Sequence, residues 1–257
     1  MLAHGITALL VCHSIYPTRC SAPVFAFYQL TILCIPYFPQ CHISPRPRLS
    51  TVDMPINMAI NNDLFSKNQF GFLKGRSTML QLLHIMEEWT SALEKGGQIN
   101  IIYADFEKTF DKVPHHLLFK KLHSYNLNVN VIQWIRSFLC YRKQRVKING
   151  CYSEWTDVIS GIPQGTILGP VLFIIYINDL PEICEEFARI YLFADDAKLF
   201  RHVTCNEDHK ALQLGLNALQ DWSNKWLLQL NILKCKTVFF GRNINKNYTY
   251  TLYKVHS

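Results

Sequence analysis

The stretch that decides the fold is residues 188–200, which read ARIYLFADDAKLF. Apolar residues on both sides of Asp195 and Asp196 predict two short buried strands, and the adjacent carboxylates predict a tight turn between them. Side chains at a hairpin turn are held rigidly and can face solvent, so this pair is a candidate cation site. Aspartate is also an ordinary turn residue, so the stretch by itself leaves a purely structural role open.

A third carboxylate lies at the end of another predicted strand. Residues 99–104 form an apolar run that leads directly into Asp105. Mg²⁺ prefers oxygen ligands and binds through one or two carboxylates together with substrate phosphates. Two such ions about 3.5–4 Å apart can activate a hydroxyl and stabilise a leaving phosphate. Neighbouring side chains on a strand point to opposite sides, so we expect Asp195 to be a fuller ligand than Asp196.

Helical and strand periods alternate along the chain from about residue 60. Such alternation predicts a layered α+β or α/β fold. The first expected helix has its apolar stripe on Met79, Leu82, Leu83, Met86, Trp89 and Leu93 and ends at Gly96 and Gly97. The other expected elements are helices after Pro114, over 131–139, over 167–178 and over 212–226, a basic half-buried strand within 142–150, a loop at 161–165 and a last strand at 237–240.

The composition is that of a globular, mildly basic protein. Of 257 residues, 49% are apolar and 18% are charged, which permits a sizeable core and argues against wholesale disorder. The net charge of +7 permits a polyanionic partner without requiring one. None of the nine cysteines forms a CxxC pair, so we expect no zinc finger and interpret the cysteines as buried thiols in a reducing compartment.

The first 57 residues differ from the rest of the chain. Residues 1–50 contain six of the eleven prolines and no acidic residue, so we expect 1–57 to be an unassigned, poorly ordered segment and 58–257 to form the domain. The apolar run at 24–38 is broken by Pro36 and is shorter than the ~20 residues of a membrane span. We therefore expect no membrane and an intracellular location, in the nucleus or cytoplasm. A secreted or membrane protein is the alternative that this run leaves open.

Five motifs occur in an order typical of one family. Together they resemble the reverse transcriptases of non-LTR (LINE-type) retrotransposons over roughly residues 58–250. The motif sequences are most similar to those of jockey and CR1-like elements. The motifs are NQFGF at 68–72 with GRST at 75–78, YADFEKTFDKVPH at 103–115, SGIPQGTILGP at 160–170, YLFADDA at 191–197, and NILKCK at 231–236 with FFGR at 239–242.

The resemblance implies an α+β right-hand polymerase palm, an antiparallel sheet backed by helices, with partial fingers and the thumb missing. It implies an RNA-directed DNA polymerase that transfers a nucleotide from a dNTP to a primer 3′-hydroxyl. Two Mg²⁺ ions, replaceable by Mn²⁺, would be held by Asp105, Asp195 and Asp196. The implied partners are an RNA template, a DNA primer and dNTPs.

The resemblance also implies roles for residues outside the carboxylates. Lys234 would lie near the departing pyrophosphate as a catalytic residue. The residues implied to bind the incoming nucleotide are Phe106, Phe110, Gln164 and Gly165. Phe110 would be the steric gate that excludes a ribose 2′-hydroxyl. The basic run at 142–147 could follow a nucleic-acid backbone. Each role has a structural alternative. Phe110 could be a core residue, Gln164 and Gly165 could form an ordinary turn, and Lys234 could be an exposed surface lysine. The basic run at 142–147 could be a solvated surface strand.

Departures from the family pattern leave two functions open. Glu107 and Thr109 replace residues that are common in the first palm motif, although neither position is expected to touch metal. RPRLS at 46–50 weakly resembles the family's fingers motif, and we interpret this resemblance as coincidence. We expect no endonuclease domain in this chain. The chain is therefore expected to be an active polymerase fragment or, alternatively, a catalytically inactive relic that only binds nucleic acid.

Overall fold

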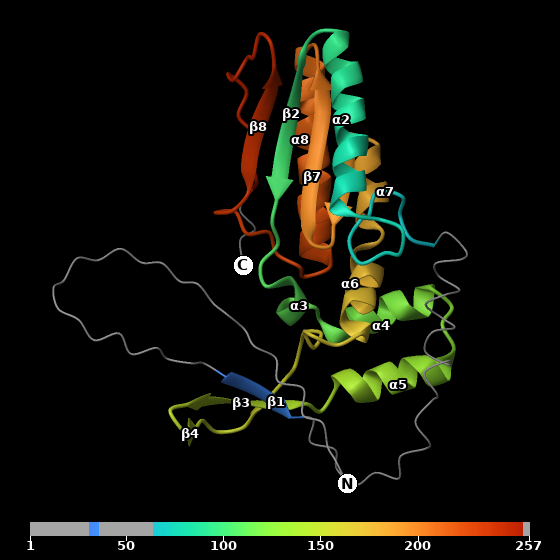
Figure 1. The fold of residues 1–257 in the computed structure, drawn as a ribbon, viewed down its shortest axis with the longest axis vertical. Helices are drawn as coiled ribbons and strands as arrows, with labels where there is room; N and C mark the ends of the chain where they lie inside the picture. The colour runs from blue at the N-terminus through green and yellow to red at the C-terminus, as the bar shows by residue number, and fades with distance from the viewer. Residues whose placement is uncertain (1–30, 36–63, 254–257) are drawn as a thin grey trace, which may run out of the picture.

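The computed structural model describes residues 31–35 and 64–253, and its centre is an antiparallel sheet of four strands in the order β6-β7-β2-β8 (Figure 1). The expectation that residues 1–57 are poorly ordered falls almost entirely on residues outside the described ranges. The described residues 31–35 form a strand. The antiparallel sheet with helices against it confirms the expected α+β class. The strands are β2 (Gln98–Ala104), β6 (Arg189–Phe193), β7 (Asp196–Val203) and β8 (Lys236–Gly241).

The sheet is packed between two long helices, α2 (Thr78–Glu94) and α8 (Asn206–Lys225) (Figure 1). Side chains along a strand alternate between its faces, and β2 shows the consequence. Ile99 and Ile101 belong to the small core on the α2 side, whereas Ile102 and Ala104 belong to the larger core. Both faces of the sheet are thus covered, which explains why β2 is apolar almost throughout.

The larger core continues below the sheet into a layer of helices (Figure 1). The helix expected over 167–178 is nearly all apolar and is buried on almost every side, with Phe173 and Tyr176 fully enclosed. A helix that is hydrophobic all round requires such enclosure. The helices of this layer are α3 (Thr109–Lys112), α4 (His115–Ser124), α5 (Val129–Leu139), α6 (Leu168–Ile177) and α7 (Leu180–Glu185).

A second, smaller antiparallel sheet lies at the end of α5 (Figure 1). Its central strand is the basic strand expected within 142–150, and that strand is partly exposed along its length. The strands are β1 (Thr31–Ile35), β3 (Lys143–Ile148), β4 (Cys151–Tyr152) and β5 (Thr156–Asp157), all paired with β3.

The expected helices and strands are confirmed in kind and order, but the expected buried stripe of α2 is confirmed only at Trp89 and Leu93 and is wrong over 79–86. Ile85 and Trp89 pack against the sheet, while Met79, Leu83 and Met86 of the expected core stripe are 71%, 60% and 56% exposed. α2 carries apolar residues on two sides, so periodicity could not decide which side meets the sheet. The stripe on α8 was assigned correctly, because its opposite side is polar.

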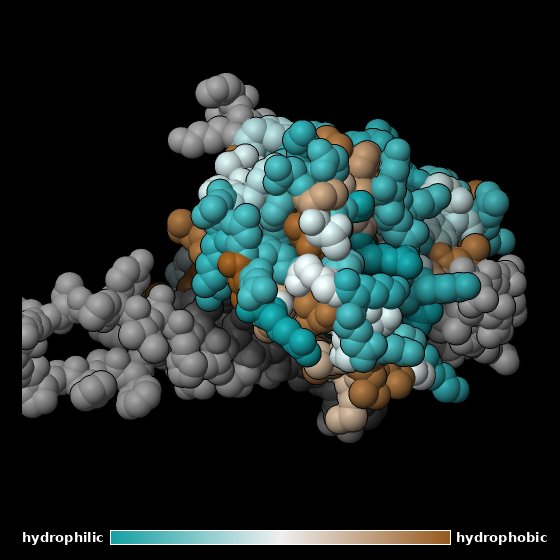
Figure 2. Space-filling view, turned by 90° about the horizontal axis from the view of Figure 1, so that it is seen from above, coloured by the Kyte–Doolittle hydropathy of each residue, from teal (hydrophilic) through white to brown (hydrophobic). Residues whose placement is uncertain are grey.

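The surface of the described part is mostly polar where Figure 2 shows it. Viewed from above, hydrophilic residues cover most of this end and hydrophobic residues form small separate patches. Among the helices that the structure describes, none is both long enough and apolar enough to span a bilayer.

A buried ion pair joins α4 to the start of α7 and to α8. Lys121 is 5% exposed and pairs with Asp179, which also accepts a 2.8 Å hydrogen bond from the Trp222 indole nitrogen. The Lys121 ammonium lies 3.8 Å from the ring centroid of Trp226. Burial lowers the pKa of Lys121, and the Asp179 carboxylate opposes that shift. The charge therefore depends on Asp179 for compensation.

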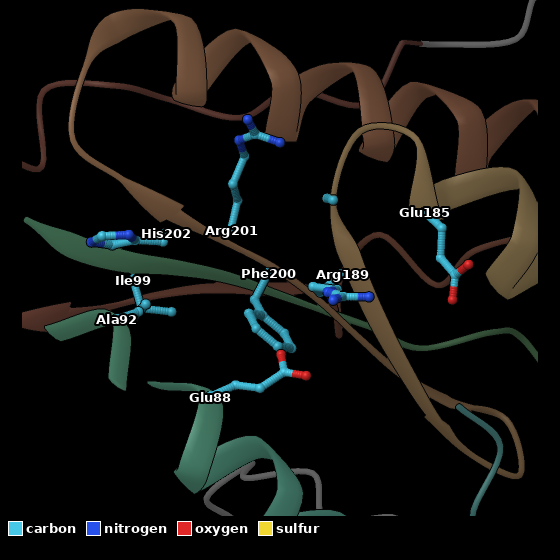
Figure 3. Close-up of a pocket in the computed structure, with 9 residues that line it drawn as sticks. Glu88, Ala92, Ile99, Glu185, Arg189, Phe200, Arg201 and His202 are labelled. Atoms are coloured by element: carbon cyan, nitrogen blue, oxygen red, sulfur yellow. The ribbon is translucent and has the colours of Figure 1, made fainter. Parts of the chain in front are cut away.

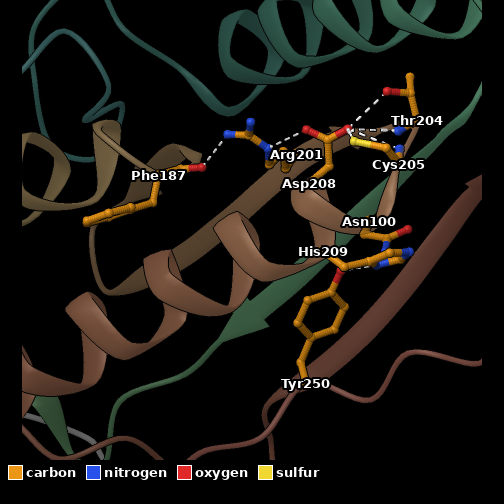
Figure 4. A network of polar contacts seen from close by, with 8 residues as sticks. All are labelled: Asn100, Phe187, Arg201, Thr204, Cys205, Asp208, His209 and Tyr250. Atoms are coloured by element: carbon orange, nitrogen blue, oxygen red, sulfur yellow. Dashed lines mark hydrogen bonds and ion pairs between the residues drawn. The ribbon is translucent and has the colours of Figure 1, made fainter.

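A polar network fastens α8 and the chain's last described segment to the sheet (Figure 4). Asn100 of β2 is fully buried and donates to the Tyr250 hydroxyl at 2.7 Å, and the His209 Nδ1 lies 3.1 Å from the Asn100 amide nitrogen. Because that amide nitrogen can only donate, the tautomer with unprotonated Nδ1 fits the network. Beside it, Arg201 pairs with Asp208 at 3.0 Å in the first turn of α8.

Replacing Asp179 by Asn should destabilise the fold, because it leaves the Lys121 charge buried without a counter-charge. The expected loss in the free energy of unfolding is about 2 kcal/mol, below the value for a fully buried pair because the Asp179 side chain is 38% exposed. Asp157→Asn is the matched control, since Asp157 is 70% exposed in its pair with Lys143 and should cost under about 0.5 kcal/mol. Urea unfolding measures both, and equal losses would contradict this account.

Acidification should weaken the network around His209. Burial lowers the pKa of His209 below 6.5, so the unfolded chain binds the proton more readily than the folded chain. The stability contributed by neutral His209 is complete above about pH 6.5 and is lost as the pH falls through the folded pKa. Burial also lowers the pKa of His115, so the wild type is compared with His209→Gln. The urea midpoint should fall between pH 7 and 5 less in the variant than in the wild type; identical slopes would exclude His209 as the source.

Candidate active site

The three candidate carboxylates lie at one end of the central sheet. Phe193 pairs with Asp196 in the β6–β7 hairpin, which leaves Ala194 and Asp195 as a two-residue turn. The β2–β7 register pairs Ala104 with Ala197, so Asp105 follows β2 directly beside that turn. The structure therefore brings together two segments of the chain that carry the expected metal ligands.

Asp196 lies within electrostatic range of the other two carboxylates. Partial burial raises the pKa of Asp196, the Asp195 carboxylate raises it further, and the Asp105 carboxylate adds a smaller effect in the same direction. Lys198 and Lys234 oppose the shift. A site that concentrates like charge in this way favours a bound cation.

Asp105 and Asp195 have different partners. The Oδ1 atom of Asp105 is buried and accepts no hydrogen bond, and the Lys234 ammonium lies 3.6 Å from it. The Oδ2 atom of Asp195 accepts a 2.7 Å hydrogen bond from the Thr109 hydroxyl. Asp105 thus presents an oxygen that is withdrawn from water and accepts no hydrogen bond, with the Lys234 ion pair beside it.

These carboxylate oxygens fit a hard divalent cation whose remaining coordination positions are filled by substrate oxygens. Within the described ranges, no three His, Cys, Asp or Glu side chains form a ready metal cage. Mg²⁺ sites of phosphoryl-transfer enzymes draw only one or two carboxylates from the protein and take the remaining oxygens from phosphates and water. The unsatisfied Asp105 Oδ1 is the observation that such a cation would explain.

The two candidate phenylalanines point in different directions. Phe110 is partly exposed and stacks on Phe173 with ring centroids 5.0 Å apart. Phe72 meets the Phe110 ring edge-on at 6.4 Å. In contrast, Phe106 is 3% exposed and its ring packs against Trp222 in the core, so this ring is out of reach of a nucleotide.

The loop at 160–166 is fastened to the segment that follows Asp105. Gly161 has φ +86° and its added Cβ would lie 2.6 Å from the Asp111 carbonyl oxygen, so the close approach requires glycine. The Gly161 carbonyl accepts hydrogen bonds from Arg142 at 2.7 Å and lies 2.8 Å from the His115 Nε2. The loop is therefore held from its buried side.

The loop's open side carries the two expected nucleotide-binding residues. Gln164 is exposed, and its amide donates to the Asp111 carboxylate at 3.3 Å. Gly165 is also exposed, with open space where a side chain would stand. Both remain accessible to a ligand, and Lys234, with a side chain 65% exposed, is accessible as well.

Two residues at the site were not found from the sequence. Thr109 was treated as a neutral departure from the motif, yet its hydroxyl binds Asp195. The available signal was a hydroxyl four residues after Asp105. Gln69 was noted only as part of a signature, yet it contacts the hairpin turn at Ala194. No local pattern in the sequence indicates that contact.

A hollow elsewhere on the sheet is not the substrate cleft. It has a volume of about 220 Å³ and lies between α2, α7 and the strands β2, β6 and β7 (Figure 3). Phe200 and Arg189 face it, and they pair with each other in the β6–β7 ladder away from the turn that carries Asp195. The hollow is smaller than the ~300 Å³ of ordinary ligand pockets.

Comparisons with known proteins agree with this geometry. The family model described as "Reverse transcriptase (RNA-dependent DNA polymerase)" matches residues 42–254. The match begins upstream of residue 58 and includes residues 46–50, which lie outside the described residues.

Curated relatives come from mobile elements. The RNA-directed DNA polymerase from mobile element jockey of Drosophila funebris is 35% identical over 185 residues, which cover 69% of this chain and 20% of that protein. The probable RNA-directed DNA polymerase from transposon BS of Drosophila melanogaster is 30% identical over 173 residues, which cover 64% and 19% respectively. The chain thus spans about a fifth of the length of the curated relatives it matches.

Solved structures show the same fold. Telomerase from Candida tropicalis, in complex with a TWJ fragment of telomeric RNA, aligns with a TM-score of 0.55 at 14% identity and covers 75% of this chain and 34% of that chain. Telomerase from Candida albicans gives a TM-score of 0.56 at 14% identity, with 78% and 36% covered. The likeness confirms the expected palm-type architecture. With the family match over residues 42–254, it follows that the chain belongs to the reverse transcriptase (RNA-dependent DNA polymerase) family.

Proposed function

We propose that this chain supplies the palm of an RNA-directed DNA polymerase of a non-LTR retrotransposon. In the proposed reaction the primer 3′-hydroxyl loses its proton to water, and its oxygen forms a bond to the α-phosphorus of a dNTP. The bond between the α-phosphorus and the bridging oxygen breaks, and pyrophosphate leaves. The observation that carries the proposal is the position of Asp105, Asp195 and Asp196 at one end of the sheet, with the buried Asp105 Oδ1 accepting no hydrogen bond.

The proposed cofactor is a pair of Mg²⁺ ions, for which Mn²⁺ could substitute. Asp105 and Asp195 would hold them, with Asp196 assisting from the start of β7. Bound there, the ions would lower the pKa of the primer hydroxyl and neutralise charge on the departing pyrophosphate. The Thr109 hydroxyl holds Oδ2 of the Asp195 carboxylate by its 2.7 Å hydrogen bond, so Oδ1 would be the oxygen available to a cation.

The surrounding residues would orient the substrates. Lys234 is exposed and already lies 3.6 Å from Asp105, so its ammonium can donate to a pyrophosphate beside the same carboxylate. Gln164 and Gly165 would meet the incoming nucleotide at the open side of their loop. Phe110 would exclude a ribose 2′-hydroxyl by its bulk, because its ring is backed by Phe173 and cannot withdraw without disturbing the core.

The smaller sheet is the proposed contact for the template or primer backbone. The Arg145 guanidinium lies 3.8 Å from the ring centroid of Tyr152 and 4.5 Å from that of Trp155. Lys143 and Lys147 continue the basic strand on either side. Cations interleaved with aromatic rings suit a nucleic-acid strand, where phosphates bind the cations and bases stack on the rings.

The alternative is a relic that binds nucleic acid through this smaller sheet without catalysis. The two functions are separated by extension of an oligo(dT) primer on a poly(rA) template with dTTP and Mg²⁺. Extension that depends on the metal supports the polymerase. Binding of the primer–template without extension, under conditions where the protein is folded, supports the relic.

Asp195→Asn should abolish primer extension. An amide oxygen replaces a charged ligand poorly at a hard cation, so kcat should fall by at least about a hundredfold. Asp221→Asn is the matched control, because Asp221 lies in α8 and accepts a hydrogen bond from the Tyr253 hydroxyl, away from the carboxylate site. The control should retain wild-type kcat, and extension by Asp195→Asn at the wild-type rate would remove Asp195 from the reaction.

Phe110→Val should relax discrimination against ribonucleotides. The space left by the ring admits the 2′-hydroxyl, so the ratio of kcat/KM for dTTP to that for UTP should fall about tenfold or more. Phe240→Val is the control, because Phe240 packs on Trp89 and pairs with Ile99 at the opposite end of β2. An unchanged ratio in Phe110→Val would leave Phe110 as a core residue.

A further inference from the structure

The upstream motif at 68–78 has no role in the proposed reaction, yet it is built around the turn that carries Asp195. The segment that contains Gln69 lies beside β6 as a short parallel extension of the sheet. The backbones of Gln69 and Leu192 form a parallel β-bridge there. The Phe70 amide donates to the Leu192 carbonyl at 2.8 Å, and the Leu192 amide donates to the Asn68 carbonyl at 2.8 Å. This pairing places the Gln69 side chain next to the hairpin turn.

The side chain of Gln69 binds both polar groups of the Ala194 backbone. The Ala194 amide donates to the Gln69 Oε1 at 2.9 Å, and the Gln69 Nε2 donates to the Ala194 carbonyl at 3.2 Å. The Gly71 amide also donates to the Gln69 Oε1, at 2.8 Å. Gln69 is 1% exposed, so water cannot replace these hydrogen bonds if they are lost.

The turn needs such support because Ala194 has an unfavourable backbone conformation. Its φ is +55°, in the region where side chains other than glycine are strained. A strained conformation persists only where the surroundings determine it, and here they do so from two sides. Gly71 packs so closely that an added Cβ would lie 2.2 Å from the Ala194 nitrogen.

The second half of the motif fixes the segment that carries Gln69. Arg76 Nη1 donates to the backbone carbonyls of Ser66 and Gln69, each at 2.5 Å. Ser77 caps α2 by accepting a hydrogen bond from the Leu80 amide at 3.2 Å. The motif thus forms a continuous connection from α2 through Gln69 to the turn before Asp195.

We propose that Gln69 is a positioning residue for catalysis: by fixing the Ala194 backbone, it sets the direction of the Asp195 carboxylate toward the cation. This inference rests on the proposed polymerase function. Gln69 touches no substrate in this account and acts through the turn. Residues that orient metal ligands in this way typically contribute about tenfold to a hundredfold in metal affinity or activity.

The test compares Gln69→Met with Gln98→Met in the full chain. Methionine keeps the length of the side chain and removes its hydrogen bonds. Gln98 is an equally buried glutamine, 4% exposed, that bonds Asn100 and the Asn245 backbone. It lies at the opposite end of β2 from Asp105, paired with Val203, so it controls for the loss of a buried amide without touching the turn.

Four quantities are measured for each variant: melting temperature, hydrogen exchange of the Ala194 amide, Mn²⁺ affinity by electron paramagnetic resonance, and steady-state primer extension against Mg²⁺. Both variants should melt at lower temperatures than the wild type. Only Gln69→Met should lose protection at Ala194, weaken Mn²⁺ binding about tenfold and lower kcat about tenfold or more, with KM for dTTP within about twofold of wild type. If Gln69→Met does not fold, Gln69→Asn is compared with Gln98→Asn under the same expectations, since asparagine keeps an uncharged amide and its shorter side chain cannot reach both polar groups of the Ala194 backbone.

Two results would overturn the inference. One is a folded Gln69→Met whose Mn²⁺ affinity and kcat match those of Gln98→Met, which would make Gln69 a structural residue only. The other is retained protection of the Ala194 amide, which would show that the turn does not need Gln69. If the wild type itself extends no primer, the proposed function fails, and Mn²⁺ affinity with amide protection still decides the role of Gln69.

Discussion

The candidate site depends on one constraint, the antiparallel register that β7 adopts with both β6 and β2. Pairing of Phe193 with Asp196 leaves a two-residue turn, and pairing of Ala104 with Ala197 brings Asp105 beside that turn. A shift of one residue in either register would turn the carboxylates to the other face of the sheet. The register is secured by burial on both faces, because α2 and α8 each cover an apolar side of the same strands.

Concentrating three carboxylates has an electrostatic cost that the rest of the site partly offsets. Partial burial raises the pKa of Asp196 most, the Asp195 and Asp105 carboxylates raise it further, and Lys198 and Lys234 lower it again. Lys198 donates a hydrogen bond to Gln81 of α2, whereas Lys234 pairs with Asp105 from an exposed position. A divalent cation would complete the compensation, which gives one physical reason why this cluster and a polyanionic substrate belong together.

The backbone around the site is held more firmly than the side chains that would meet substrate. Gly161 is fixed by the Asp111, His115 and Arg142 contacts, while Gln164 and Gly165 in the same loop are exposed. Ala194 is held by Gln69 and Gly71, while Asp195 and Asp196 extend from it. Rigid support behind accessible groups is the arrangement that positioning of reactants requires.

The sequence by itself determined the kind and order of the main helices and strands, and it named the carboxylates of the candidate site. Local periodicity identifies a strand or helix wherever one face is clearly apolar, as on α8. The motifs at 103–115 and 191–197 contain the three aspartates of the candidate site. Only the tertiary structure decided which side of α2 is buried, and that the Phe106 ring lies in the core while Phe110 stays accessible. It also decided that Thr109 bonds to Asp195 and that Gln69 bonds to Ala194. The physical reason is distance along the chain. The contact from Gln69 to Ala194 joins residues 125 positions apart, and a pattern read over one turn or one strand carries no information about such a partner.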